Sequence, residues 1–96
     1  MIYNNVVLNV SNSSDVETVK GLLRECGDLS KKEPGCERFE IYQSQVDKLQ
    51  FFLIERWSNQ EQLDAHREAH AFKNIYVPHV LPLVSRFPHP SDKLFD

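Results

Sequence analysis

The segment LQFFLIERW, from Leu49 to Trp57, carries the pattern that decides the fold. It is rich in aromatic and β-branched residues, which are enriched in strands. Phe51 to Ile54 are apolar at four successive positions, whereas a strand with one solvated face alternates apolar and polar residues. Because successive side chains point to opposite faces of a sheet, both faces of this strand must be covered. One face meets the helices of the same chain, and a second copy of the same sheet is the simplest cover for the other.

A second strand, CERFEIYQS from Cys36 to Ser44, precedes this segment and is separated from it by the short polar link QVDK. This arrangement predicts an antiparallel hairpin in which Ser44 pairs with Leu49. The face away from the helices is then expected to carry Arg38, Glu40, Tyr42, Glu55 and Trp57. The face toward the helices is expected to carry Phe39, Ile41, Phe52 and Ile54. A slip of one residue would exchange the two faces.

The remaining elements follow from the periodicity of apolar residues and from helix start signals at Ser14–Glu17 and Ser58–Glu61. In chain order they are a strand over Ile2–Val10, a helix over about Asp15–Lys31, a helix from Ser58 to about His70, a further helical turn or two over Ala71–Val77 that Pro78 ends, and an extended edge segment over Leu81–Phe87. The order β-α-β-β-α-β predicts an α+β ferredoxin-like fold, with an antiparallel sheet and helices on one face. We expect one domain over residues 1–96.

The composition excludes several classes of function. The net charge is −3, which argues against nucleic acid, because a phosphate-binding face needs a basic excess. No apolar run is long enough to span a membrane, and the first residues lack the features of a signal peptide. Cys26 and Cys36 match no zinc or redox spacing. We therefore expect a cytoplasmic protein with two reduced thiols.

The segment LDAHREAH, from Leu63 to His70, contains the candidate chemistry. His66 and His70 are one helical turn apart and project from nearly the same face. A zinc-protease pattern needs Glu directly after the first His; Arg67 stands there, so no metal site is predicted, although Asp64 or His79 could supply a third ligand. His66 is nearer the middle of the apolar stripe and is the candidate for proton transfer. The alternative, stronger for His70, is that both lie at the edge of a packed helix face.

Polar residues within the apolar strands predict a small-molecule cavity, between sheet and helices or between two sheets. Asn5 and Asn9 share one face of the first strand. The alternative is a sheet face whose polar groups satisfy one another, with Arg38 and Glu55 as a cross-strand ion pair and Trp57 in the core.

Several motifs, in this order and spacing, resemble the antibiotic biosynthesis monooxygenase family over about Val6–Phe87. They are Glu33-Pro34-Gly35-Cys36, Phe39-Glu40-Ile41-Tyr42-Gln43-Ser44, Glu55-Arg56-Trp57, Leu63-Asp64-Ala65-His66 and His70-Ala71-Phe72. The resemblance implies a dimeric α+β barrel, in which two ferredoxin-like sheets pack face to face. It also implies a monooxygenase that oxidises a small quinol, phenolic or polyketide-like substrate with O₂ and uses no metal, flavin or other cofactor.

The resemblance also implies roles for individual residues. His66 would be the base or proton relay, and Asn5, the second candidate catalytic residue, or Asn9 would hold a substrate oxygen. The remaining candidates for binding the substrate are Tyr42, Phe51, Trp57, His70 and Phe72.

Other branches of the same family imply different functions. Haem-degrading members are matched by Asn5 but not by His66, which takes the place of a Trp, or by Tyr76, which takes the place of the axial His, so no haem is expected. An isomerase of the phosphorylated signal autoinducer-2 is the alternative activity, and the C-terminal FPHPSDKLF is similar to the tail of that group. A dimer that binds a small molecule without catalysis is the third alternative.

Overall fold

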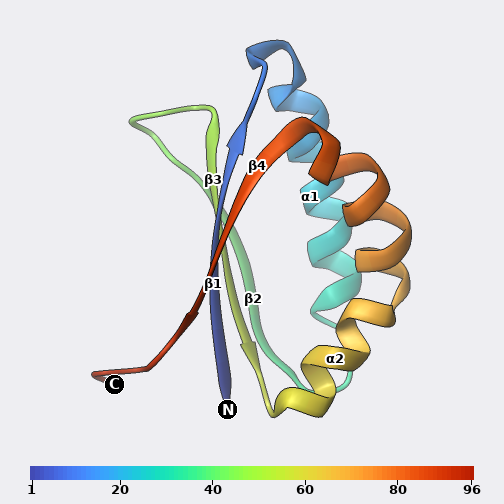
Figure 1. Ribbon diagram of the computed structural model, residues 1–96, viewed down its shortest axis with the longest axis vertical. Coiled ribbons are helices and arrows are strands. Elements are labelled where there is room, and N and C mark those ends of the chain that lie inside the picture. The colour runs from blue at the N-terminus through green and yellow to red at the C-terminus, as the bar shows by residue number, and fades with distance from the viewer.

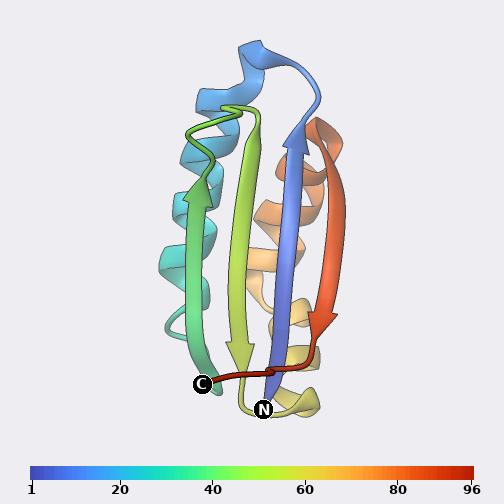
Figure 2. The same cartoon turned by 90° about the vertical axis from the view of Figure 1, so that its left-hand side faces the viewer.

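The computed structural model describes residues 1–96, in which three helices cover one face of a four-stranded antiparallel sheet (Figure 1). The strands are β1 (Ile2–Val10), β2 (Cys36–Gln43), β3 (Gln50–Trp57) and β4 (Val84–Ser91). The helical layer comprises α1 (Val16–Ser30), α2 (Gln60–Glu68), the π-helix η2 (Ala71–Val80) and the short 3-10 turns η1 (Ser13–Asp15) and η3 (Leu81–Leu83). The strands lie in the order β2-β3-β1-β4 (Figure 2). The predicted α+β ferredoxin-like fold is confirmed.

The core lies between the sheet and the helices. Every second residue of β1 and β3 is buried, because alternate side chains point toward the helical layer. The core cluster comprises Val6, Leu8, Val10, Val19, Leu23, Cys26, Phe51, Leu53, Ile75, Tyr76 and Val80. No helical layer covers the opposite face of the sheet, and the C-terminal residues run across one end of it (Figures 1 and 2). No helix is both long and apolar enough to cross a membrane.

The predicted register of the β2–β3 hairpin is wrong by one residue. Tyr42 pairs with Phe52 and not with Phe51. This slip exchanges the two faces of β3, so that Glu55 and Trp57 point toward the helices. The face without helices, called the bare face below, carries the β2 and β3 side chains Arg38, Glu40, Tyr42, Phe52, Ile54 and Arg56.

The loop between the two strands explains the slip. The N–H of Ser44 donates to the carbonyl of Gln50, and the hydroxyl of Ser44 accepts hydrogen bonds from the two loop residues Val46 and Asp47. Residue 44 therefore belongs to the turn and does not pair with residue 49. The expected ion pair across the strands is absent as well, because Arg38 lies opposite Arg56 and binds Glu40 of its own strand at 2.7 Å.

Asparagine side chains cap η1 and α2, and neither predicted capping box forms. The side chain of Asn12 accepts a hydrogen bond from the N–H of Ser14, and that of Asn59 accepts one from the N–H of Gln62. Asparagine caps helices as well as serine does. The extra turn η1 places Ser14 inside the helical region, and the cap of α2 lies one residue later than predicted.

The helical segment after α2 continues through Pro78 and ends at Val80. Proline ends an α-helix because it lacks an N–H and its ring meets the preceding turn. The wider π-turns, with the N–H of Leu81 donating to the carbonyl of Tyr76, accommodate it. Strand β4 consequently spans Val84–Ser91 and not the predicted Leu81–Phe87.

Gly35, in the turn before β2, is constrained by both conformation and space. Its φ is +79°, and a Cβ atom there would lie 2.4 Å from Cγ of Gln62. We expect Gly35→Ala to lower the free energy of unfolding by about 1–3 kcal/mol, measured by urea denaturation. Gly21→Ala is the control, because a Cβ atom there meets nothing within 4 Å and alanine favours the helix. Equal denaturation midpoints for the two variants would contradict this reading.

Candidate functional site

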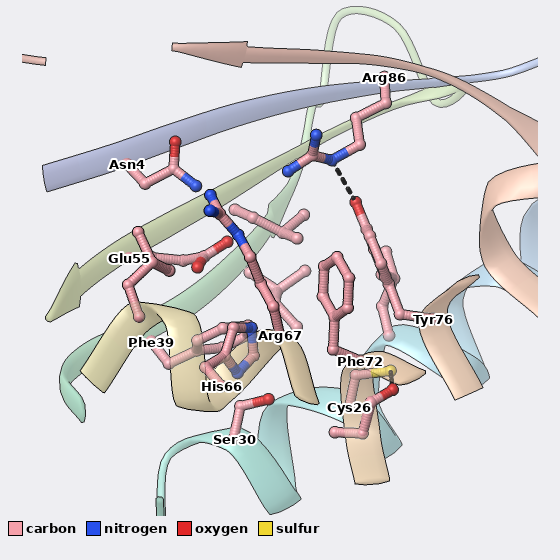
Figure 3. A pocket seen from close by; sticks show the side chains of 15 residues that line it. Asn4, Cys26, Ser30, Phe39, Glu55, His66, Arg67, Phe72, Tyr76 and Arg86 are labelled. Carbon is pink, nitrogen blue, oxygen red and sulfur yellow. Dashed lines mark hydrogen bonds between the residues drawn. The ribbon is translucent and has the colours of Figure 1, made fainter. Parts of the chain in front are cut away.

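A narrow cavity lies between the sheet and the helical layer (Figure 3). It is lined by Asn4, Leu23, Cys26, Ser30, Phe39, Ile41, Leu53, Glu55, Leu63, His66, Arg67, Ala71, Phe72, Tyr76 and Arg86. The cavity and its open mouth together hold about 440 Å³ of empty space, part of which is open to solvent. The volume in which the centre of a water molecule fits is only about 20 Å³. This conformation therefore has room for water, and a larger ligand requires side chains at the mouth to move.

His66 forms the aromatic side of this cavity. Its side chain is 6% exposed, and its ring lies 4.4 Å from the ring of Trp57, between centroids. Phe39 and Phe72 flank it at 6.0 and 5.6 Å. This packing holds the imidazole in one orientation, as a group that transfers protons requires.

A carboxylate determines which ring nitrogen of His66 is free. Nδ1 of His66 lies 2.7 Å from Oε1 of Glu33, which is 16% exposed. When Nδ1–H donates to this carboxylate, Nε2 of the neutral imidazole remains as a free acceptor. Nε2 is thus the ring atom available to a ligand in the cavity.

Glu33 is a site residue that the sequence did not single out. It lies in the turn after α1, where its N–H donates to the carbonyl of Ser30 and its own carbonyl accepts from the N–H of Cys36. The turn brings the carboxylate beside α2, although Glu33 and His66 are 33 residues apart. The one sequence signal was its position at the start of the Glu33-Pro34-Gly35 motif.

Polar groups gather at the other end of the cavity (Figure 3). Glu55 accepts a hydrogen bond from Nε1 of Trp57 at 3.0 Å. The pKa of Glu55 is raised, and burial is the main cause. This hydrogen bond and the nearby cationic side chains act in the opposite direction but do not cancel the effect of burial. The Nε–H of Arg86 donates to the hydroxyl of Tyr76 at 3.1 Å, and burial raises the pKa of Tyr76. Asn4 is 4% exposed, and its Oδ1 has no hydrogen-bond partner.

The structure brings only part of the predicted site together. His66 and Phe72 line the cavity, and Trp57 packs against His66. Asn5 and Asn9 lie on the bare face, where Asn5 donates to the Ser91 hydroxyl and Asn9 accepts from Gln50. The structure therefore does not bring Asn5 or Asn9 together with His66. The reason is that successive side chains of β1 point to opposite faces of the sheet. Asn4 shares a face with the buried side chains of β1, whereas Asn5 and Asn9 point the other way.

Three other predicted residues lie outside the cavity. Tyr42 is half-exposed on the bare face, and Phe51 is packed in the core. His70 is exposed, and its Nδ1 lies 3.0 Å from Nδ2 of Asn74. Helix α2 ends at Glu68 and the next residue is extended, so His70 no longer shares a helix face with His66.

The two thiols are not activated. Burial raises the pKa of both Cys26 and Cys36 to about 11, so both are protonated at neutral pH, and neither forms a disulfide. The structure has no group of three or more His, Cys, Asp or Glu side chains that could hold a metal ion.

Known proteins share this fold. The family model for antibiotic biosynthesis monooxygenase matches residues 1–76. A structure from Bacteroides thetaiotaomicron, of a conserved protein of unknown function described as a possible oxidoreductase, is 28% identical, with a TM-score of 0.87 over 94% of each chain. A candidate antibiotic biosynthesis monooxygenase from Nitrosomonas europaea is 25% identical, with a TM-score of 0.85 over 98% of this chain and 91% of that one.

A third structure, of a candidate antibiotic biosynthesis monooxygenase from Deinococcus radiodurans, covers 100% of this chain and 97% of that one with a TM-score of 0.83. At 13% identity it shows the fold alone. No curated protein matches the chain significantly.

Proposed function

Because the chain belongs to the antibiotic biosynthesis monooxygenase family, we propose that it oxidises a small phenolic, quinol or polyketide-like substrate with O₂ beside His66, without a cofactor. The family and its structural neighbours support a monooxygenase-like role in general. The observation that carries the finer proposal is the pair of Glu33 and His66, which leaves Nε2 free at the edge of an apolar cavity.

The proposed reaction starts with proton transfer. Nε2 of His66 takes the proton of the substrate hydroxyl, and the carboxylate of Glu33 stabilises the imidazolium that forms. The guanidinium groups of Arg67 and Arg86, which line the same cavity, stabilise the substrate anion. The narrowness of the cavity leaves little room for water beside this anion.

The substrate then reduces O₂ by itself. One electron passes from the anion to O₂, and the two radicals combine in a carbon–oxygen bond. The peroxide anion that results takes back the proton held by the imidazolium of His66, and the hydroperoxide so formed loses water and leaves a carbonyl group. For a hydroxynaphthalene that becomes a quinone, the substrate supplies all four electrons; one oxygen atom of O₂ stays in the product and the other leaves as water. The protein contributes the base and the surroundings, and no second reductant is needed.

We also propose that a second copy of the chain covers the bare face, which gives a homodimer. The register places an apolar row across all four strands on this face, made of Tyr42, Phe52, Val7 and Phe87. Tyr42 and Phe87 are about half exposed in the single chain. Two such faces would cover each other, as the apolar run at the centre of β3 requires.

Oxygen uptake by the purified protein, across a panel of quinols and hydroxynaphthalenes, tests the activity. An isomerase is the second candidate, because two guanidinium groups in one cavity also suit a phosphorylated substrate. It would convert a sugar phosphate without consuming O₂, and a binding protein would do neither. Absence of oxygen uptake with every member of the panel would contradict the proposed activity.

Glu33 is proposed as a positioning residue, and its replacement gives a specific expectation. Glu33→Gln removes a charge-assisted hydrogen bond to His66, and such bonds contribute about 1.5–3 kcal/mol. We expect kcat for oxygen uptake to fall by about tenfold to hundredfold, with little change in KM, because Glu33 does not line the cavity. Glu33→Asp should restore part of the loss.

The control is Glu37→Gln, which removes an exposed carboxylate that accepts a hydrogen bond from Ser58. This variant should keep the activity of the wild type. A Glu33→Gln protein with unchanged kcat would show that Glu33 only supports the turn in which it lies.

A further inference from the structure

We infer that the ligand of this cavity carries an acidic group, a carboxylate or a phosphate, which Arg86 binds together with Arg67 and Asn4. The substrate would then be a phenolic acid or a related oxyacid and not a neutral phenol. This inference rests on the proposed function in one respect, since it takes the cavity beside His66 as the substrate site.

Arg86 has unused hydrogen-bonding capacity inside the protein. It comes from β4, lines the cavity and is half-buried. Its Nε–H donates to Tyr76, which fixes the plane of the guanidinium. It takes part in none of the ion pairs of the chain. A guanidinium has five N–H donors, so four remain for a ligand or for water.

Arg67 stands at the mouth of the same cavity. Its side chain is 45% exposed, and its nearest carboxylate is that of Asp64 at 4.0 Å on the helix surface. The Arg67 side chain is long and has no close ion-pair partner, so it can move aside to admit a ligand and then close over it. This motion would also supply the space that the narrow cavity lacks.

The polar end of the cavity carries more cationic than anionic side chains. Among the lining residues Arg67 and Arg86 are cationic, and Glu55 alone carries a carboxyl group. The carboxylate of Glu33 lies outside the lining and is paired with His66. The local excess of cationic groups at the polar end favours an anionic ligand there.

The polar end presents donors to one another. In Figure 3 the amide nitrogen of Asn4 points toward the guanidinium of Arg67, and the guanidinium of Arg86 lies at the same end of the cavity. No hydrogen bond joins Asn4 to either arginine, and Asn4 is nearly fully buried. The free N–H groups of Arg86 and the amide N–H₂ of the buried Asn4 can donate to an acceptor placed between them. The two oxygens of a carboxylate, or the oxygens of a phosphate, provide acceptors in the geometry that guanidinium groups prefer.

The test is calorimetric titration without O₂, using three ligands on one ring system: 1-hydroxy-2-naphthoate, its methyl ester and 1-naphthyl phosphate. We expect wild-type protein to bind the acid or the phosphate about tenfold to hundredfold more tightly than the ester. Tighter binding of the naphthoate would identify the acidic group as a carboxylate, and tighter binding of the naphthyl phosphate would identify it as a phosphate. Arg86→Gln should remove the preference and leave the affinity for the ester within about twofold.

Two further variants keep the outcome decisive. Arg67→Gln changes a surface position that cannot impair folding seriously, and it should weaken the preference for the anion. Arg24→Gln removes an exposed charge from α1 and should leave the preference intact. Equal affinities of wild type for ester and anions, no binding of either anion, or a preference that survives Arg86→Gln would each overturn the inference.

Oxygen uptake with the acid and the ester, the two ligands that keep a free hydroxyl, separates this inference from the proposed activity. Preferential binding of an anion without oxygen uptake would leave the acidic-group site standing and remove the oxygenase. Oxygen uptake that is as fast with the ester as with the acid would support the oxygenase and argue against the acidic-group site.

Discussion

Replacement of His66 by alanine is expected to lower kcat/KM for oxygen uptake by about 10²- to 10⁴-fold, the usual contribution of a positioned general base. Two other ionisable groups of the cavity cannot take its place. Burial raises the pKa of Cys26 and Tyr76, so both are protonated at neutral pH. Burial also raises the pKa of Glu55, but its carboxylate already accepts a hydrogen bond from Trp57. The proposal therefore assigns the substrate proton to Nε2 of His66, which the contact with Glu33 leaves free.

Two companion variants distinguish chemistry from packing. His66→Gln keeps a side chain of similar length that can still bond to Glu33, so it preserves the fold better than alanine but removes the base. His70→Ala removes an exposed imidazole bonded to Asn74 and should retain nearly full activity. If folded His66→Gln consumes oxygen as fast as wild type, His66 is a packing residue and the proton goes elsewhere.

Replacement of Phe52 by lysine is expected to convert the proposed dimer to monomers at micromolar concentration. Phe52 lies at the centre of the bare face, between Tyr42 of β2 and Val7 of β1. An unpaired buried charge costs at least about 1–3 kcal/mol, and two-fold symmetry places the lysine twice in the interface. The dissociation constant should therefore rise about a hundredfold or more, which sedimentation velocity over a concentration series would measure.

Val77→Lys is the matched control. Val77 is 41% exposed on η2, on the other side of the sheet from the proposed interface, so this variant should assemble as wild type does. Wild-type protein that sediments as a monomer throughout, or Phe52→Lys protein that remains a dimer, would contradict assembly through the bare face.

The fold was predictable because it depends on averages over many residues. The two-sided apolar run in β3 and the helical periodicity of α1 tolerate errors at single positions, and the resulting order of elements is confirmed. The register was not predictable in the same way, since it depends on one turn in which Ser44 accepts hydrogen bonds from the loop. A single residue in that turn decides whether Glu55 and Trp57 face the helices or the bare face.

The site was predictable in part. The sequence placed His66 in a cavity because it lies on the apolar stripe of α2, and Phe72 because it follows in the same motif, and both line the cavity of the structure. Asn4 could have been found, since residues of one strand alternate between faces and Asn4 has the parity of the apolar residues Val6 and Leu8. The contact of Glu33 with His66 has no local signal, because it depends on how the turn after α1 packs against α2.

Oxidation of a phenolic acid by metal-free wild-type protein under labelled ¹⁸O₂ tests the central proposal most directly. The protein would first be treated with a chelator and shown to contain neither metal nor flavin. We expect one ¹⁸O atom per product molecule, one O₂ consumed per substrate, and loss of both signals in His66→Gln protein. Product that forms without ¹⁸O, or oxygen uptake that disappears on chelation and returns with added metal, would contradict a cofactor-independent monooxygenase.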